Sequence, residues 1–197
     1  MAPRHLVMEE LGDALAAVDP GRLMRVGIDG VDGAGKTLLA EDVAQLLTTR
    51  GRPAVRVSID QFERTMEERY VRGELSPEGY YLDAFDFLRF REHVLSVRAP
   101  GHAVLVCDGV FLHRPELADL WDASIFVEVD LEVAARRGAE RNLGVWDDSL
   151  DATHERYRVR YMPAQRRYIE AQRPHEQATF VLRNTQLDDP ELITPRR

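Results

Sequence analysis

The chain has 197 residues with 34 acidic and 26 basic side chains, which gives a net charge of −8 at pH 7. This acidic balance argues against duplex nucleic acid as the main partner, so no nucleic-acid partner is expected. The single cysteine, Cys107, excludes an intrachain disulfide framework and a cysteine-based zinc site. The first twenty residues lack the apolar core of a signal peptide, and no stretch reaches the ~20 apolar residues that cross a bilayer. We therefore expect a cytoplasmic protein without a membrane partner, folded as a single domain over residues 1–197.

The chain begins with a pattern typical of an amphipathic helix. Leu6, Leu11, Leu15 and Val18 fall near helical spacing, with acidic residues between them. The Asp19-Pro20-Gly21 run ends this pattern. Residues 1–20 are therefore predicted to form an N-terminal helix that packs on the domain.

A short buried strand predicted at 24–29 leads directly into a glycine-rich loop. The segment Gly30-Val-Asp-Gly-Ala-Gly-Lys-Thr37 matches the phosphate-binding pattern G-x-x-x-x-G-K-[ST], and a helical pattern follows it. Strand, loop and helix in this order direct backbone N–H groups and a helix N-terminus at phosphates. The sequence therefore predicts a nucleoside triphosphate site, with ATP and GTP both open at this point, made by Gly30, Asp32, Gly33, Ala34, Gly35, Lys36, Thr37 and Leu38.

Lys36 is the single lysine among the 26 basic side chains, so the other 25 are arginines. Lysine is needed at this position because its narrow stem can thread the loop and carry a compact charge to the β/γ-phosphates. We expect Lys36 to neutralise charge that develops during phosphoryl transfer. The Thr37 hydroxyl is the predicted ligand for Mg²⁺.

Four further strands are predicted, at 54–59, 103–107, 124–129 and 179–182, with helical patterns between most of them. Their continuous apolar runs are typical of strands buried on both faces. The alternation predicts an α/β fold with a parallel sheet between two layers of helices. Residues 188–197 are predicted to form a loosely held tail.

Two aspartates follow predicted strands at the edge where open α/β sheets bind ligands. Asp108 comes directly after the strand at 103–107, as expected for a carboxylate that holds Mg²⁺ or its waters. Asp60 follows the strand at 54–59 and could accept a proton from an attacking hydroxyl. The alternative for either residue is an ordinary turn aspartate.

Arginines crowd two later segments, one on the helix after the strand at 124–129 and one at 156–167. Such clusters are typical of a lid that brings guanidinium groups to the transition state and excludes water. Arg137 and Arg141 are the predicted catalytic arginines, and the lid is expected over about 142–165. Gly144 and Asp147-Asp148 could form its hinge. Solvated or salt-bridged helix faces are the alternative for each arginine.

Aromatic side chains between the second and third predicted strands could cradle a flat polar acceptor. The predicted acceptor contacts in this part of the chain are Phe62, Arg69, Tyr80 and Tyr81, with Tyr70, Arg64 and Arg72 nearby. Phe85, Phe87 and Phe90 instead fit the core-facing stripe of a helix near 86–97. His113 is a further acceptor candidate, or an ordinary residue at a surface or helix start.

At this point the chain resembles the uridine kinase-like branch of P-loop kinases, a group related to phosphoribulokinase and to one type of pantothenate kinase. The resemblance covers most of residues 24–184 and rests on the glycine loop, on Ser58-Ile-Asp-Gln-Phe62, on segments 69–73 and 76–86, and on Asp108-Gly-Val-Phe111. It implies a three-layer P-loop NTPase fold with five parallel strands and an arginine-rich lid. It also implies ATP with Mg²⁺, Asp60 as the base, Phe111 beside the acceptor, and phosphorylation of a primary hydroxyl such as a nucleoside 5′-OH.

The sequence departs from well-known uridine kinases where the acceptor would be selected. Glu63 stands where they place a tyrosine, Tyr80 aligns with an acidic residue, and Asn142 follows Arg141 where they have aspartate. The acceptor is therefore open among small molecules, and the oligomeric state is open too, with a homodimer as one arrangement. A nucleoside monophosphate acceptor, as in thymidylate kinases, and a nucleotide-binding switch without acceptor chemistry remain the alternatives.

Overall fold

The computed structural model describes residues 3–145, 149–187 and 189–194. The strands are β1 (Met24–Gly30), β2 (Ala54–Ser58), β3 (Val104–Gly109), β4 (Ala123–Glu128), β5 (Phe180–Arg183) and β6 (Glu191–Ile193). The helices are α1 (Arg4–Ala16), α2 (Lys36–Thr49), α3 (Met66–Arg69), α4 (Pro77–Asp83), α5 (Phe87–Ser96), α6 (Leu131–Arg141), α7 (Leu150–Arg156), α8 (Met162–Gln172) and α9 (Pro174–Gln177). Short 3-10 helices span Ile59–Phe62 and Ala118–Leu120, and a π-helical turn, Tyr157–Tyr161, joins α7 to α8.

The sheet has six strands in the order β2-β3-β1-β4-β5-β6. The first five are parallel, as predicted, whereas β6 pairs antiparallel with β5 through Leu182 and Leu192. The prediction of a loose tail over 188–197 was therefore wrong for residues 191–193. Three residues are too few to show the alternation of apolar and polar side chains that marks a strand.

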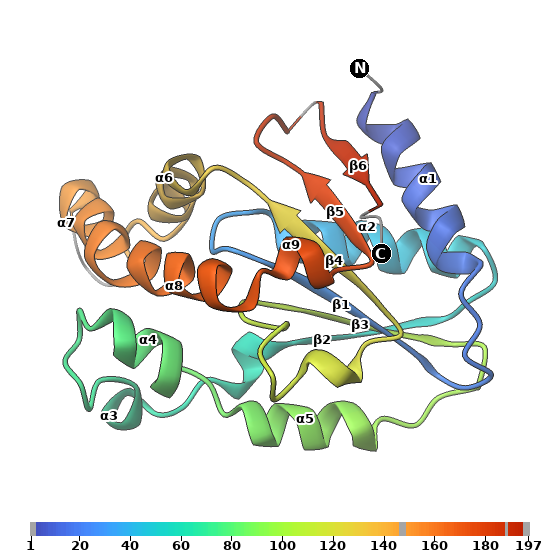
Figure 1. Cartoon of the computed structure of the whole chain (residues 1–197), viewed down its shortest axis with the longest axis horizontal. Coiled ribbons are helices and arrows are strands. Elements are labelled where there is room, and N and C mark those ends of the chain that lie inside the picture. Colours follow the sequence, from blue (N-terminus) through green and yellow to red (C-terminus); the bar gives the residue numbers. More distant parts are fainter. Residues whose placement is uncertain (1–2, 146–148, 188, 195–197) are drawn as a thin grey trace.

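Helices cover both faces of the sheet and create two cores (Figure 1). On one face, Leu11 of α1 and Val43 of α2 pack against Val26 and Val106 of the central strands. On the other face, the larger core holds aromatic residues from α4, α5 and α8, including Phe90. Alternate residues of β3 point to opposite faces, since Leu105 lies in the second core. This is the predicted three-layer α/β architecture.

The topology brings the predicted site residues to one edge of the sheet. β1 lies between β3 and β4, so the chain leaves β1 at a point where neighbouring connections run in opposite directions, the usual place for a ligand in open α/β sheets. In the register of the parallel strands, Asp29 pairs with Gly109, and Ser58 pairs with Asp108. The glycine loop and Asp60 therefore follow strand ends at the same edge, where Asp108 is the second-last residue of β3 rather than, as predicted, the residue after a strand.

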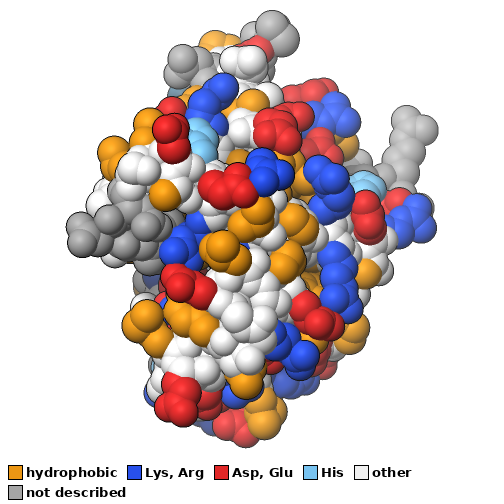
Figure 2. Space-filling model, turned by 90° about the vertical axis from the view of Figure 1, so that its left-hand side faces the viewer, with side chains coloured by type: hydrophobic (Ala, Val, Ile, Leu, Met, Phe, Trp, Pro, Cys, Tyr) orange, Lys and Arg blue, Asp and Glu red, His pale blue; other side chains and the backbone are white. Residues whose placement is uncertain are grey.

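The face on the left-hand side of Figure 1, where α7, α3 and α4 lie, carries both signs of charge (Figure 2). Acidic and basic side chains lie beside one another there, with apolar side chains among them. Over the described ranges, no helix has both the length and the apolar content needed to cross a membrane.

Candidate active site

The glycine loop has the backbone shape that a phosphate-binding loop needs. Gly33 and Gly35 have φ angles of 80° and 93°, in the left-handed region that favours glycine. A side chain at Gly33 would also collide with α6, because a Cβ there would lie 2.0 Å from the Ala134 carbonyl oxygen. Lys36 begins α2 and is buried, and its Nζ donates to the Val31 carbonyl 2.9 Å away. The loop is therefore held closely around its lysine.

Thr37 and Asp108 meet at the start of α2. The Thr37 hydroxyl donates to Oδ2 of Asp108 at 3.1 Å, and the Ser58 hydroxyl lies 3.4 Å from the same oxygen. Asp108 is buried, and its Oδ1 has no hydrogen-bond partner among the described residues, although Arg56 Nη2 lies 3.7 Å away. A hydroxyl and a carboxylate with one free oxygen are ligands suited to Mg²⁺.

The described residues contain no group of three or more His, Cys, Asp or Glu side chains arranged for a metal ion. This fits the usual behaviour of Mg²⁺, which keeps several waters and is held by one or two protein groups together with phosphates. Thr37 and Asp108 could therefore hold Mg²⁺ beside a triphosphate.

Asp60 lies in the 3-10 turn after β2, where the Ser58 hydroxyl accepts a hydrogen bond from the Asp60 backbone N–H. Its side chain lines a cleft of about 630 Å³. Lys36, Thr37 and Asp108 also line this cleft. Enclosure by the cleft raises the pKa of Asp60, with Lys36 opposing and the charges of Asp32 and Asp108 reinforcing the rise. A carboxylate with a raised pKa is a stronger base than an ordinary aspartate.

The other wall of the cleft is largely aromatic. Tyr80 stacks edge-on against Tyr161 with 4.6 Å between ring centroids, and Phe85 lies on the other side of Tyr80. Arg69 is the basic residue of this wall, and its Nη1 is 2.5 Å from the Glu63 carboxylate. The full set of cleft residues is Asp32, Lys36, Thr37, Asp60, Glu63, Met66, Arg69, Tyr70, Tyr80, Phe85, Asp108, Val110, Arg141, Asn142, Val145 and Tyr161.

Asp32 of the glycine loop joins the loop to the segments that follow α6. Its carboxylate accepts hydrogen bonds from Arg141 Nη2 at 2.9 Å and from the Tyr157 hydroxyl at 2.7 Å. Its backbone N–H donates to Gln165 of α8 at 3.1 Å, and Asn142 donates to the Tyr157 hydroxyl at 2.7 Å. The Lys36 and Arg141 charges together with the Tyr157 hydrogen bond hold the pKa of Asp32 below its usual range despite burial. Asp32 is thus an ionised anchor for Arg141.

Several predicted site residues do not reach the cleft. Phe62 is buried against Phe90 of α5, with ring centroids 5.3 Å apart. Phe111 is buried behind Tyr80, and Tyr81 is buried beneath the Arg114 guanidinium, 4.3 Å from its ring. These three side chains belong to the aromatic core because α5 covers Phe62 and Arg114 covers Tyr81, whereas Tyr80 of the same segment lines the cleft.

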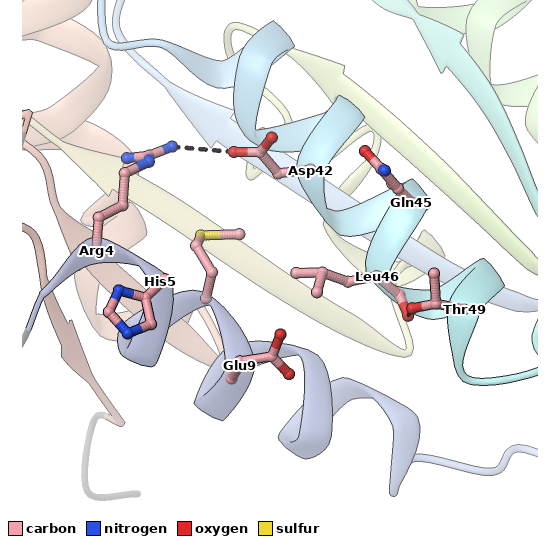
Figure 3. A pocket seen from close by; sticks show the side chains of 8 residues that line it. Arg4, His5, Glu9, Asp42, Gln45, Leu46 and Thr49 are labelled. Carbon is pink, nitrogen blue, oxygen red and sulfur yellow. Dashed lines mark hydrogen bonds and ion pairs between the residues drawn. The ribbon is translucent and has the colours of Figure 1, made fainter.

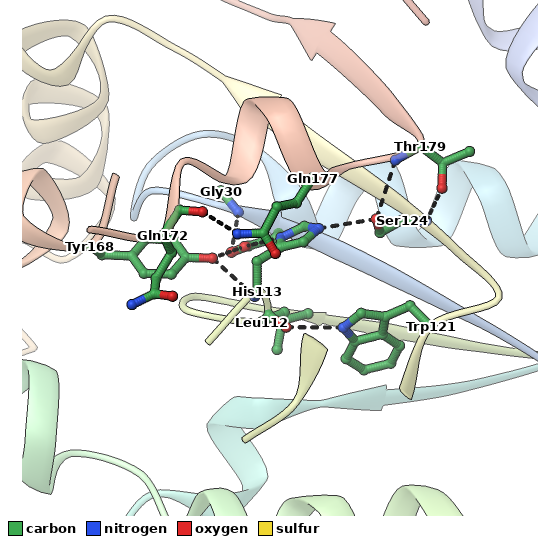
Figure 4. A network of polar contacts seen from close by, with 10 residues as sticks. Gly30, Leu112, His113, Trp121, Ser124, Tyr168, Gln172, Gln177 and Thr179 are labelled. Carbon is green, nitrogen blue, oxygen red and sulfur yellow. Dashed lines mark hydrogen bonds and ion pairs between the residues drawn. The ribbon is translucent and has the colours of Figure 1, made fainter. Parts of the chain in front are cut away.

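His113 was also predicted to touch the acceptor, but the structure places it in the interior (Figure 4). Its Nδ1 lies 2.6 Å from Asp29, and its Nε2 lies 3.0 Å from the Ser124 hydroxyl. Asp29 also accepts hydrogen bonds from Tyr168 and from the backbone N–H of Gly30. The histidine therefore ties β1, β4 and α8 together immediately before the glycine loop.

Arg137 was predicted to be catalytic, but like His113 it makes structural contacts instead. Its two Nη atoms donate to the carbonyls of Asn184 and Thr185, at 3.0 and 2.7 Å, so the guanidinium is engaged away from the cleft. Asn184 in turn donates to the Ala34 carbonyl at 2.9 Å. Arg137 therefore fixes the loop after β5 against the glycine loop, whereas Arg141 faces the cleft.

Other predictions fall at the edge of the site or outside the described residues. Leu38 contributes the first turn of α2, but its side chain is exposed. Gly144 has a φ of 81°, a backbone conformation that suits a bend. The remaining hinge residues predicted, Asp147-Asp148, lie outside the described residues.

A second hollow, of about 660 Å³, lies between α1 and α2 (Figure 3). Its walls carry Arg4 and Asp42, which form an ion pair at 3.1 Å, together with Met8 and Leu46. None of the predicted site residues lines it, so the cleft beside the glycine loop is the candidate active site.

The comparisons with known proteins agree with this geometry. The chain is 24% identical to the uridine kinase of Leuconostoc citreum (strain KM20) over 169 residues, which cover 74% of this chain and 80% of that relative. A possible uridine kinase from Bacillus stearothermophilus superposes with a TM-score of 0.69 at 20% identity, covering 90% of this chain and 97% of that one. A kinase ascribed to a fructose transport system of Silicibacter sp. TM1040 gives a TM-score of 0.67 at 24% identity, covering 84% and 94% of the two chains. No family model matches the chain.

The predicted resemblance to uridine kinase-like P-loop kinases is confirmed, and so is the α/β P-loop kinase fold. At these identities the structural similarity establishes the fold, while the kinase relatives support a phosphotransferase of this group. Related scaffolds carry very different acceptors, so the acceptor must be argued from the site itself.

Proposed function

We propose that this protein transfers the γ-phosphoryl group of ATP·Mg²⁺ to a hydroxyl of an uncharged small molecule, a nucleoside 5′-OH above all. The observation that supports it best is the position of Asp60. It shares one cleft with the glycine-loop residues Lys36 and Thr37, and the opposite wall of that cleft is aromatic. A base between a phosphate-binding loop and an aromatic wall is what transfer to a hydroxyl requires.

In the proposed reaction the glycine loop binds the triphosphate, and Thr37 and Asp108 would hold Mg²⁺, a cation that would supply positive charge beside the phosphates. Asp60 accepts the proton of the attacking hydroxyl, while Lys36 and Arg141 stabilise charge on the transferred group. Segment 142–165, which carries Tyr157 and Tyr161, acts as the lid of a single domain. These roles depend mainly on position, since phosphoryl transfer needs little covalent chemistry from the protein.

The charges of the cleft favour an uncharged acceptor over a nucleoside monophosphate. A monophosphate site needs arginine directed at the acceptor phosphate. Arg64 instead donates to the Phe85 carbonyl, and Arg72 pairs with Asp83 at 2.8 Å, so neither lines the cleft. Arg69 does line it but is paired with Glu63. The carboxylate of Asp60 would therefore repel an acceptor phosphate, while the guanidinium of Arg69 is already paired.

A nucleotide-binding switch is the alternative outside the kinases. It would use the same loop but would have no need for a base in a cleft of about 630 Å³ with an aromatic wall. The arrangement of Asp60 with Tyr80 and Tyr161 thus favours acceptor chemistry.

The proposal is tested by measuring ADP release from ATP·Mg²⁺ with a panel of acceptors and with no acceptor. The panel contains uridine, cytidine, other nucleosides, fructose, pantothenate, ribulose 5-phosphate and thymidine monophosphate. We expect ADP release that depends on an uncharged acceptor. Equal release in every sample would indicate an ATPase or switch, and a preference for thymidine monophosphate would establish the monophosphate alternative.

Asp32→Asn should bind ATP·Mg²⁺ several-fold more tightly than the parent protein while its kcat falls by a similar factor. The substitution removes a negative charge beside the triphosphate, which favours binding. It also removes the anion that orients Arg141, which disfavours transfer. Isothermal titration and steady-state kinetics measure the two effects separately.

The matched control for this prediction is Asp13→Asn, which makes the same charge change on the exposed surface of α1, where Asp13 pairs with Arg50 at 2.9 Å. It should leave both quantities unchanged. Weaker ATP binding by the Asp32 variant, with normal binding by the control, would contradict the charge argument, and an unchanged kcat would contradict the orienting role.

A further inference from the structure

A buried arginine lies behind the aromatic wall of the cleft. Arg160, in the π-helical turn between α7 and α8, is completely buried. Its Nη1 donates to the backbone carbonyls of Glu74 and Ser76, at 2.6 and 3.2 Å. Its Nε and Nη2 are buried without hydrogen-bond partners, and no carboxylate pairs with it among the residues that the structure describes. Arginine stays protonated at any working pH, so a full positive charge remains in the interior.

Three tyrosine rings take the place of a counter-ion. The Arg160 guanidinium lies 5.0 Å from the ring centroid of Tyr70, 5.5 Å from that of Tyr80 and 5.8 Å from that of Tyr161. These distances fall within the range of cation–π attraction. All three tyrosines line the cleft on their other side. The guanidinium is therefore separated from the acceptor space by one layer of rings.

The same arginine joins two segments that are far apart in the sequence. Its carbonyl partners lie between α3 and α4, the segment that carries Tyr70 and leads to Tyr80. Arg156, one turn earlier, supports this junction by pairing with the Glu74 carboxylate at 2.7 Å. Arg160 thus fixes the α3–α4 segment against the π-helical turn, and π-helical turns are frequent at functional sites.

A contribution to the free energy of folding does not explain why a charged guanidinium is buried at position 160. Burying a guanidinium without a carboxylate is costly, and an apolar side chain of similar volume could fill the same space. The charge does, however, act on the cleft. Asp32 and Glu63 there are each paired with an arginine, while the carboxylates of Asp60 and Asp108 add negative charge beside Lys36. At the aromatic wall the field of Arg160 opposes theirs.

We propose that Arg160 is a specificity-determining positioning residue of the acceptor site. It fixes Tyr70, Tyr80 and Tyr161 as one wall and makes that wall electropositive. The wall therefore selects a flat head group that presents carbonyl oxygens, and disfavours one that presents an amino group at the same place. This inference rests on the proposed function, because it concerns the acceptor of the same cleft.

The test compares Arg160→Met, which removes the charge and the donors, with Arg160→Lys, which keeps a charge without the planar fork. Arg98→Met is the matched control, since Arg98 is exposed just after α5, outside the cleft and the proposed lid, and its Nη1 donates to the Leu95 carbonyl at 2.9 Å. Kinetics are measured with two pairs of nucleosides that differ by an oxo or an amino group, uridine with cytidine and inosine with adenosine. Hydrogen exchange is measured for residues 70–80 and for the glycine loop.

For the parent protein we expect higher kcat/KM with the oxo member of each pair. Arg160→Met should raise the acceptor KM about tenfold or more, leave the ATP KM within about twofold, and reduce the oxo preference at least about fivefold. Arg160→Lys should raise the acceptor KM but retain much of the preference, because it retains the charge. Faster exchange should be confined to residues 70–80 in Arg160→Met, and the control should match the parent.

The measurements separate a failure of the proposed function from a failure of the role of Arg160. No acceptor-dependent ADP with any nucleoside would overturn the proposed function and the oxo selection with it, while the exchange data would still decide whether Arg160 fixes the α3–α4 segment. Activity with a preference for the amino members would overturn the selection alone. Faster exchange throughout the protein, or equal increases of the acceptor and ATP KM values, would assign Arg160 a purely structural role.

Discussion

Asp60→Asn should lower kcat by about a hundredfold or more while leaving ATP affinity nearly unchanged. Asparagine has almost the same size and keeps the 3-10 turn, whose cap comes from the Ser58 hydroxyl and the residue 60 backbone N–H. It cannot accept the proton of an attacking hydroxyl. Single-turnover measurements with saturating ATP and the best acceptor would separate this loss from any change in binding.

The matched control for Asp60 is Glu63→Gln, which removes a second carboxylate from the same cleft. Glu63 is paired with Arg69 at 2.5 Å and has no proposed role in proton transfer. We expect it to change the acceptor KM more than kcat. Comparable kcat losses in the two variants would mean that Asp60 acts only through its charge, and near-normal turnover by Asp60→Asn would eliminate it as the base.

The raised pKa of Asp60 also predicts a pH dependence. A base acts in its ionised form, so the acid limb of kcat/KM should lie above the pKa of an ordinary aspartate, about 3.9. This limb should disappear from the residual activity of Asp60→Asn. A limb that persists at the same pH in that variant would assign it to another group.

The raised pKa of Asp60 also predicts how the stability of the protein depends on pH. Because the pKa of Asp60 is higher in the folded than in the unfolded protein, its ionisation costs stability. The cost is absent below the unfolded pKa and complete above the folded pKa. Asp60→Asn should therefore have a Tm at pH 8 no lower than that of the parent, with any gain shrinking toward pH 4. Loss of activity without loss of Tm would separate a catalytic from a structural role.

Much of the fold could be predicted from the sequence because its strands are continuous apolar runs between helical patterns. Met24–Gly30 is followed at once by the glycine loop, and this local order is sufficient to position Gly33, Lys36 and Thr37. The strand at 191–193 could not be predicted in the same way. It depends on pairing with Phe180–Arg183, a contact between segments that no local pattern reports.

The candidate site could be predicted where its residues follow strand ends. Asp60 and Asp108 needed only the parallel sheet to bring them together. Side chains such as His113 and Arg137 could not be placed, because their sequence neighbours do not show whether they face the cleft or the interior. Tyr161 was likewise missed as a wall residue, and Tyr157 as the partner of Asp32, since their positions depend on how the π-helical turn between α7 and α8 packs against the glycine loop.

Lys36→Ala should lower kcat/KM for ATP by at least about two orders of magnitude, with a higher KM and a lower kcat. The lysine is buried at the start of α2, and its Nζ lies 2.9 Å from the Val31 carbonyl, within the loop that would surround the phosphates. Its removal takes away a charge that favours both binding and transfer. Nucleotide titration and steady-state kinetics on the same preparation would measure the two effects.

Lys36→Arg makes the sharper comparison, because it keeps the charge in a chain whose other 25 basic residues are all arginine. The buried Lys36 stem brings Nζ to within 2.9 Å of the Val31 carbonyl, a position that suits a compact charge on a narrow stem better than a planar guanidinium. We expect Lys36→Arg to recover less than about a tenth of the lost activity, since a fork displaced from the phosphates cannot act as a compact charge. Arg98→Lys, on the exposed surface after α5, is the reverse exchange and should have no effect. Full activity in Lys36→Arg would show that the loop selects for charge alone.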